Sequence, residues 1–256
     1  EYDYPEPLCV GLGGGIATPQ SAAAAFSMGA AYILTGSVNQ SCVEAGICDD
    51  VKAMLCQAEQ ADVTMAPSAD MFELGARVQV LKRGTMFPVR AEKLRKLYQA
   101  HDRFEDIDPG QKKEIEEKFL KAGFDQAWAS TREFFLKTGN TREIERAQDN
   151  PKHKMALVFR SYLGLSSKWA IQGLPERKMD YQIWCGPAIG AFNQWVKGTF
   201  LEQPENRKTA EIGLNLMMGA AVYMRASMLK AQGVSLPDNA DRFEPMRIEE
   251  LTEYIV

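Results

Sequence analysis

The first pattern in the chain is an apolar segment followed by a glycine run and then a helical segment. The apolar segment, Leu8–Leu12, leads directly into three consecutive glycines, Gly13–Gly15. Thr18 then offers a side-chain oxygen for a helix N-cap, and Pro19 has the backbone angle of a first helical residue. An alanine-rich stretch follows, and Gly29 is suited to end it in a left-handed conformation. The pattern predicts a strand, a glycine loop and a helix of about ten residues.

A second strand and a second glycine loop follow this helix. The run Ala31–Leu34 is apolar and stops at Thr35-Gly36-Ser37. The whole segment therefore predicts one βαβ unit with a glycine loop at the carboxyl end of each strand. Loops without side chains expose backbone N–H groups, and helix N-termini add positive potential, so this edge of the unit is suited to binding a phosphate.

Beyond the βαβ unit the apolar positions recur mainly at helical spacing. Weak strand patterns occur at Ala61–Pro67 and Val78–Leu81, and from Arg90 onward the chain is almost wholly helical. The predicted helices are approximately Asp49–Glu59, Ala91–Ala100, a helix capped by Asp108, Phe124–Lys137, Thr141–Ala147, Pro151–Leu163, Ala191–Val196, Asn206–Gln232 and Ile248–Tyr254.

Two strands and one helix cannot close a sheet or cover their own apolar faces. Either the helical region packs on these strands, or the absent strands lie in a preceding portion of chain, and the second arrangement is the one expected. The sequence starts with an extended lead, 1–7, that has no initiator methionine and enters the first strand directly. We expect the sequence to be the C-terminal part of a longer protein.

Three kinds of phosphate site have glycine loops of this type. A dinucleotide-binding fingerprint fails, because its third glycine would fall at Ile16 or Thr18 and the second strand ends at Gly36 without an acidic residue. A Walker A loop fails, because no Lys-Ser or Lys-Thr pair follows at the required spacing. The loops after strands 7 and 8 of a (β/α)₈ barrel require one glycine loop after each of two consecutive strands, as found here. The predicted fold class is therefore α/β, with strands 7 and 8 of a TIM barrel followed by a mainly α-helical region.

Composition excludes several functional classes. The chain is 45% hydrophobic and 25% charged with a net charge of −4, which is ordinary for a globular protein and gives no indication of nucleic-acid binding. The five cysteines are an odd number without disulfide-framework spacing, so a reducing, cytoplasmic setting is expected. No signal-peptide pattern is present, and no apolar run approaches the roughly 20 residues of a membrane helix.

Several segments resemble one enzyme family. The stretch 13–46, GGGIATPQSAAAAFSMGAAYILTGSVNQSCVEAG, is similar to the strand 7 to strand 8 segment of the FMN-dependent, 2-nitropropane-dioxygenase-like barrels. It resembles more closely the trans-acting enoyl reductases of polyunsaturated-fatty-acid synthases and of trans-acyltransferase polyketide synthases. MFELGARVQVLKRG at 71–84 and CGPAIGAFNQWVKG at 185–198 are more specific to this family than the glycine loops. The resemblance covers nearly the whole chain up to about Gly233.

The resemblance implies an FMN site. The resemblance implies that the backbone of Gly14, Gly15 and Ile16, together with Gly36 and Ser37, holds the FMN phosphate. The implied reaction is hydride transfer from NAD(P)H to FMN and then to the β-carbon of an enoyl thioester on an acyl carrier protein. The implied partners are a carrier protein with a phosphopantetheine-bound enoyl chain, other synthase subunits and the remaining N-terminal barrel segment, with no nucleic acid or membrane.

The resemblance also implies roles for ranges of the chain. Residues 1–67 would be the last βαβ part of the FMN barrel, 68–233 a helical region for substrate and carrier protein, and 234–256 a C-terminal tail. The family's catalytic histidine would lie upstream of Glu1. A nitronate monooxygenase-type flavoprotein and a non-catalytic helical docking module of a megasynthase are the alternative functions.

The residues offer few other candidates for chemistry. His101 and His153 are the only histidines, and each is expected to be a solvated residue near a helix end rather than a catalytic group. Cys42, Cys48 and Cys56 have no CxxC spacing and no nearby histidine, so no metal site is expected. They are better explained as small buried residues.

A basic run and a set of aromatic residues remain open to two interpretations. The basic run is an ordinary solvated face by default, and its alternative is a surface that docks an acidic acyl carrier protein or its phosphopantetheine phosphate. The aromatic residues are expected in cores, although some could line an acyl tunnel. The basic residues are Lys82, Arg83, Arg90, Lys93, Arg95 and Lys96, and the aromatic residues are Trp128, Phe134, Phe135, Trp169, Trp184 and Trp195.

Overall fold

The computed structural model describes residues 4–254, so the first three residues of the predicted N-terminal lead lie outside the described residues. The chain divides into two compact units. The first joins Glu1–Val63 to Cys185–Val256, and the second is the continuous segment Thr64–Trp184. The helices after Cys185 therefore belong to the same compact unit as the N-terminal segment. The roles given above to 1–67, 68–233 and 234–256 stay predictions.

The first unit contains the predicted βαβ segment. Strand β1, Leu12–Gly13, pairs in parallel with strand β2, Ile33–Leu34, and helix α1, Pro19–Ser27, connects them. Leu12 pairs with Ile33 and Gly13 with Leu34. The predicted order of strand, loop, helix and strand is confirmed. Each strand is only two residues long, because no further strand lies beside the pair in the described part of the chain.

The ends of α1 are fixed by the residues that the sequence indicates. The Thr18 hydroxyl oxygen accepts a hydrogen bond from the Ser21 backbone N–H at 3.3 Å. The Ser21 hydroxyl oxygen accepts one from the Thr18 N–H at 3.0 Å, which completes a reciprocal cap. Gly29 follows the helix with a φ of +95°, a conformation in which glycine carries no steric penalty.

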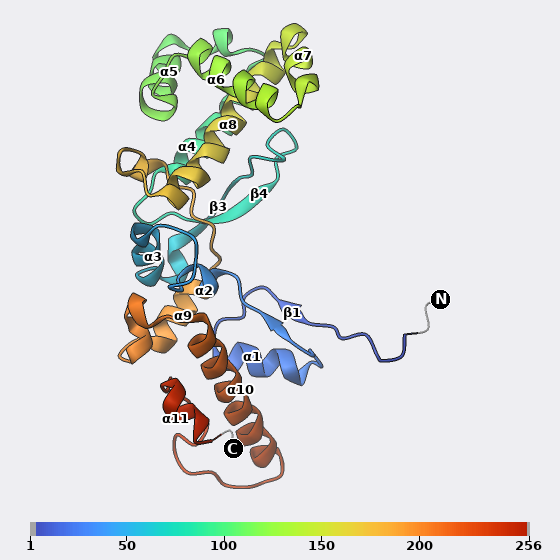
Figure 1. Ribbon diagram of the computed structural model, residues 1–256, viewed down its shortest axis with the longest axis vertical. Coiled ribbons are helices and arrows are strands. Elements are labelled where there is room, and N and C mark those ends of the chain that lie inside the picture. The colour runs from blue at the N-terminus through green and yellow to red at the C-terminus, as the bar shows by residue number, and fades with distance from the viewer. Residues whose placement is uncertain (1–3, 255–256) are drawn as a thin grey trace. The chain divides into compact units, whose positions relative to one another are not determined.

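The rest of the first unit is helical. Helix α10 packs against α1 (Figure 1), and the absence of a side chain at Gly219 allows this approach. A Cβ at Gly219 would lie 2.6 Å from the Pro19 ring and 2.7 Å from the Phe243 ring. The helices of this part are α2 (Ser37–Gln40), α3 (Asp49–Cys56), α9 (Ala188–Val196), α10 (Thr209–Ala231), α11 (Ile248–Thr252) and the 3₁₀ turns Gln60–Asp62, Phe200–Glu202 and Pro204–Asn206.

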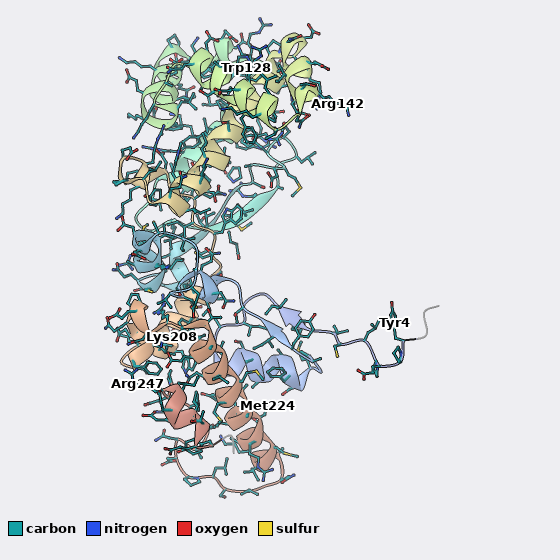
Figure 2. All side chains as sticks on the ribbon, viewed as in Figure 1. Tyr4, Trp128, Arg142, Lys208, Met224 and Arg247 are labelled. Carbon is teal, nitrogen blue, oxygen red and sulfur yellow. The ribbon has the colours of Figure 1, made fainter. Side chains whose placement is uncertain are left out.

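Helix α10 differs from expectation in two ways. Among residues 4–254, α10 is the one helix whose length and apolar composition would allow it to cross a membrane. No apolar segment of this length was expected from the sequence. Its buried residues Ile212, Leu216 and Ala220 belong to two cores of the first unit, as in the core helix of a globular domain. It also begins at Thr209, three residues after the predicted start at Asn206. Its Met217 and Met224 side chains are 49% and 37% exposed; Figure 2 labels Met224.

The second unit is a short sheet followed by a helical assembly. Helix α8 runs through its core and contributes buried Met155, Val158, Phe159 and Leu163. The sequence pattern predicted that α8 ends at Leu163, but it continues to Gln172, where Gly173 follows at φ +68°. The elements are β3 (Val63–Pro67) paired with β4 (Arg77–Leu81), α4 (Phe87–Ala100), α5 (Pro109–Glu114), a π-helical turn (Ile115–Leu120), α6 (Phe124–Lys137), α7 (Thr141–Asp149), α8 (Pro151–Gln172) and the 3₁₀ turns Phe104–Asp106 and Pro175–Asp180.

A buried carboxylate links the elements of the second unit. Asp180 is 1% exposed and accepts hydrogen bonds from Arg90, from the Tyr162 hydroxyl at 2.7 Å and from Arg177 at 3.2 Å. Burial beside this carboxylate raises the pKa of Tyr162 well above its usual value, so Tyr162 stays protonated and donates. The network ties α4, α8 and the 175–180 turn together.

Candidate functional site

The two predicted glycine loops lie at one edge of the first unit. Because β1 and β2 are parallel and Gly13 pairs with Leu34, the loops that follow these two residues start side by side. Within residues 4–254, the backbone N–H groups of Gly14, Gly15 and Ile16 donate no hydrogen bond to the protein. Gly14 and Gly15 are exposed. This edge therefore holds several backbone donors that the fold does not use.

The glycines of the two loops differ in what the fold demands of them. Gly14 and Gly15 have φ values of +90° and +74°, which favour glycine over other residues. Gly36 has an ordinary φ of −107°, and a Cβ placed there would meet no atom within 4 Å. The described fold therefore explains the first two glycines by conformation but does not require the third. A ligand that approaches the backbone would explain it.

Ser37 connects the second loop to a distant segment of the same unit. Its hydroxyl oxygen accepts a hydrogen bond from the Gly186 backbone N–H at 2.8 Å. The Ser37 hydroxyl proton remains available for donation to a ligand oxygen. Gly186 lies in the CGPAIGAF segment. The sequence did not predict that this segment contacts the second glycine loop.

The side chain of Ile16 anchors the first loop in a core of the first unit. It is 7% exposed and packs with the alanines of α1 and with Ala220 of α10. The next two backbone N–H groups, those of Ala17 and Thr18, are already bonded to the Ser21 hydroxyl. The free donors of this loop are thus the amides of the glycine turn, and the positive end of the α1 dipole lies beyond them.

These donors fit a phosphate. Residues 8–43 contain no Asp, Glu, Lys, Arg or His, so neither a carboxylate repels an anion nor a cation attracts one within this segment. Backbone amides, one hydroxyl and a helix N-terminus are the donor set with which proteins bind phosphate groups at such loops. The roles of Gly14, Gly15, Ile16, Gly36 and Ser37 in holding a phosphate, and the assignment of FMN to this site, stay predictions.

The two histidines are placed differently from one another. His153 was expected to be solvated but is 7% exposed, and its ring Nε2 lies 2.7 Å from a carboxylate oxygen of Glu143. Its position in the first turn of α8 buries the ring because α7 packs across that turn. His101 is the C-cap of α4, where its backbone N–H donates to the Leu97 carbonyl. Both histidines belong to the second unit, whereas the glycine loops belong to the first.

The five cysteines are free thiols. Burial raises the pKa of Cys185 to about 12 and raises the pKa values of Cys42 and Cys56 above their usual range, so these three stay protonated near neutral pH. Cys9 is exposed. Among residues 4–254, no group of three or more His, Cys, Asp or Glu side chains is arranged to hold a metal ion.

The basic run is not a uniform solvated face. Arg90 is directed at the buried Asp180, and the Lys93 ammonium lies 2.6 Å from Glu114. The guanidinium of Arg95 lies over the rings of Phe72 and Tyr98, at 5.6 and 5.5 Å from their centroids. The solvated interpretation is therefore wrong for Arg90, because its long-range carboxylate partner draws the side chain inward.

The aromatic residues fall into buried and exposed groups. Trp128 and Trp169 pack against the core of the second unit; Figure 2 labels Trp128 on α6. Trp195 packs against a core of the first unit. Phe134 and Trp184 were expected in cores but are 60% and 53% exposed. The acyl tunnel stays a prediction.

Comparison with known proteins finds homologues of this chain in polyunsaturated fatty acid and polyketide biosynthesis. Residues 101–181 match the family of inserted helical domains of acyl-carrier-protein S-malonyltransferases. The chain is 46% identical over 236 residues to one of the polyunsaturated fatty acid synthase subunits of Thraustochytrium, covering 90% of this chain and 16% of that protein. It is 47% identical over 228 residues to polyketide biosynthesis protein PksE of Bacillus subtilis, covering 89% of this chain and 29% of that protein.

A solved structure shows the same architecture. The enoyl reductase domain of MlnA, from the macrolactin biosynthesis cluster of Bacillus amyloliquefaciens, superposes with a TM-score of 0.83 at 41% identity. The match covers 89% of this chain and 51% of that domain. The chain therefore spans about half of this domain and less than a third of the curated relatives given above. Its homologues are polyunsaturated-fatty-acid synthase subunits and polyketide biosynthesis proteins, as the resemblance predicted.

The family match also clarifies the division of the chain. The matched residues, 101–181, lie within the second unit, Thr64–Trp184. That unit is inserted in sequence between the two segments that form the first unit. This insertion is not evident in the sequence, because a continuous series of helices has no compositional boundary at Trp184.

Proposed function

We propose that this chain is the phosphate-anchoring and helical part of an FMN-dependent, NAD(P)H-using enoyl-thioester reductase of polyunsaturated fatty acid or polyketide biosynthesis. One observation supports the proposal above the others. A pair of uncharged glycine loops with free backbone donors occurs in a chain that is 41% identical to an enoyl reductase domain. A bound FMN would supply hydride transfer between NAD(P)H and the β-carbon of an enoyl thioester.

The chain's own residues would bind and orient the cofactor. The amides of Gly14, Gly15 and Ile16 would donate to phosphate oxygens, and the Ser37 hydroxyl would add a donor from the second loop. The left-handed glycines fix the first loop, and the Gly186 bond fixes Ser37. Donors held in this way need little reorganisation when the anion binds, which favours affinity.

The substrate would be presented on an acyl carrier protein, and the other synthase subunits would be further partners. Two comparisons support this part of the proposal. The relatives are subunits and proteins of multienzyme biosynthesis, and the second unit contains a match to a helical domain of transferases that act on acyl carrier protein.

Gly36 is the loop glycine that the described fold does not require. Replacing Gly36 with aspartate is expected to lower the FMN content of the purified protein at least about tenfold, because a carboxylate would then lie beside the phosphate. The substitution is compatible with the fold, since Gly36 has a negative φ and open space at its Cβ position. The measurement is the ratio of released flavin to protein after acid denaturation.

Gly46→Asp is the matched control. Gly46 belongs to the same unit and also has open space at its Cβ position. The control variant should retain wild-type flavin content and the same circular dichroism spectrum. Equal flavin content in Gly36→Asp and wild type would contradict the assignment of the phosphate site.

A further inference from the structure

A groove of about 740 Å³ lies in the second unit between helix α4 and the paired strands β3 and β4. Thr64 and Met65 of β3 and Arg77 of β4 form one wall, and Val89 and Lys93 of α4 lie on the other. The groove belongs entirely to this unit and contains none of the residues proposed to bind FMN phosphate.

The groove is cationic although the chain as a whole is acidic. Four basic residues and one acidic residue line it, whereas the net charge of the chain is −4. Two of the basic residues are compensated, since Arg77 pairs with Glu92 at 3.0 Å and Lys93 pairs with Glu114 at 2.6 Å.

Two lysines in the groove keep an uncompensated charge. Lys82 and Lys96 are exposed, and within residues 4–254 neither side chain makes an ion pair or a hydrogen bond. Lys96 follows Lys93 at a spacing of three residues, and Lys93 follows Val89 at a spacing of four, so all three lie on one face of α4. The free positive charge therefore lies along the groove.

Apolar side chains are exposed between these charges. Met65 is 43% exposed, Met86 39% and Val89 62%, and all three line the groove. Methionine side chains are flexible and adapt to irregular apolar surfaces, which makes them common at binding surfaces for several partners. An apolar centre with a charged rim is the usual anatomy of a transient protein interface.

We infer that this groove is the docking surface for the acidic helical face of an acyl carrier protein that presents carboxylates around an apolar centre. The inference rests on the proposed function for the identity of the partner. The groove's own chemistry supports a protein surface rather than an isolated phosphate. Its free cations are lysines, which act as point charges, and the guanidinium of Arg77 is already paired with the Glu92 carboxylate. An isolated phosphate would also leave Met65 and Val89 uncovered.

The test compares a groove variant with a matched charge reversal elsewhere on the same unit. The groove variant is Lys82→Glu combined with Lys96→Glu. The control combines Arg132→Glu with Lys168→Glu, because both residues are exposed, lie outside the groove and make no ion pair within residues 4–254. Both variants are first compared with wild type by circular dichroism and flavin content.

Two readouts separate docking from chemistry. Fluorescence anisotropy measures the Kd for a labelled, crotonyl-loaded acyl carrier protein, and NADPH oxidation measures reduction of that substrate and of crotonyl-pantetheine. The groove variant should bind the carrier roughly tenfold more weakly than wild type, with a reduced dependence on salt, because it reverses two steering charges. Its activity with crotonyl-pantetheine should equal that of wild type, and the control should match wild type throughout.

Several outcomes would overturn the inference. Unchanged carrier affinity in the groove variant would do so while leaving the reductase proposal intact. Equal weakening in the control variant, or no carrier binding by wild type, would also do so. Displacement of the carrier by free phosphopantetheine at stoichiometric concentration would assign the groove to the phosphate instead. If wild type lacks flavin and reduces neither substrate, the reductase proposal fails, and the anisotropy comparison still decides the docking surface.

Discussion

Replacing Asp180 with alanine is expected to lower the free energy of unfolding of the Thr64–Trp184 unit by about 3–5 kcal/mol. The carboxylate is 1% exposed and accepts from Arg90, Tyr162 and Arg177. Its removal leaves two guanidinium groups without their counter-charge in a partly buried site, which costs more than the loss of an isolated hydrogen bond. Because the network joins α4, α8 and the 175–180 turn, the loss should affect the whole unit.

Hydrogen exchange of the α8 amides measures this effect within the unit. Two substitutions serve as graded controls. Tyr162→Phe removes one donor to Asp180 and should cost about 1 kcal/mol. Asp102→Ala removes an exposed partner of Lys152 and should leave exchange unchanged. Exchange in Asp180→Ala equal to that in Asp102→Ala would show that the network does not hold the unit together.

Gly190→Ala is expected to destabilise the first unit by about 3 kcal/mol, through overpacking against a backbone. An alanine Cβ would lie 2.1 Å from the Gln60 backbone nitrogen and 2.3 Å from the Glu59 carbonyl carbon. Gly190 is buried in α9, which packs on the 60–62 turn. The obstacle is backbone rather than a side chain that could move aside, so the two segments must separate.

Gly213→Ala is the control for this effect. Gly213 also lies within a helix, α10, but a Cβ there meets no atom within 4 Å. Alanine has the higher helix propensity, so this variant should be as stable as wild type or more stable, by up to about 1 kcal/mol. Urea denaturation of both variants provides the comparison. A Gly190→Ala midpoint at or above that of Gly213→Ala would refute the close approach of α9 to the 60–62 turn.

Local signals in the sequence predicted the βαβ segment well. Thr18, Pro19 and Gly29 act through their own neighbours in the chain, so the start and end of α1 could be identified without tertiary structure. The end of α8 could not be identified in this way. Gly164 and the serines after it suggest a break, but a Cβ at Gly164 would meet no atom within 4 Å and Ser166 bonds back to the Tyr162 carbonyl. The helix therefore continues to Gln172.

Long-range partners explain what the sequence did not predict. Arg90 pairs with Asp180, a residue 90 positions away, and nothing in the local pattern indicates that its side chain turns inward. The buried guanidinium of Arg207 likewise donates to Ser41 and Asn193 from separate segments. A charged residue whose partner lies far along the chain is indistinguishable, in sequence, from one on a solvated face.

The candidate site was predictable in part. The glycine loops that follow β1 and β2 are local features, and the parallel register that brings them together follows from the βαβ connection. The link from Ser37 to Gly186 spans 149 positions and depends on how α9 packs in the first unit. That the amides of Gly14, Gly15 and Ile16 have no acceptor in the described part of the chain depends on the three-dimensional structure and is not evident in the sequence.

The central claim is tested most directly by NADPH oxidation in the full-length protein that contains this sequence, measured anaerobically with and without crotonyl-pantetheine. The account predicts that FMN accompanies the purified protein and that NADPH is consumed in proportion to added thioester, with butyryl-pantetheine as the product. An absence of bound flavin, or NADPH consumption that does not respond to the thioester, would contradict the account.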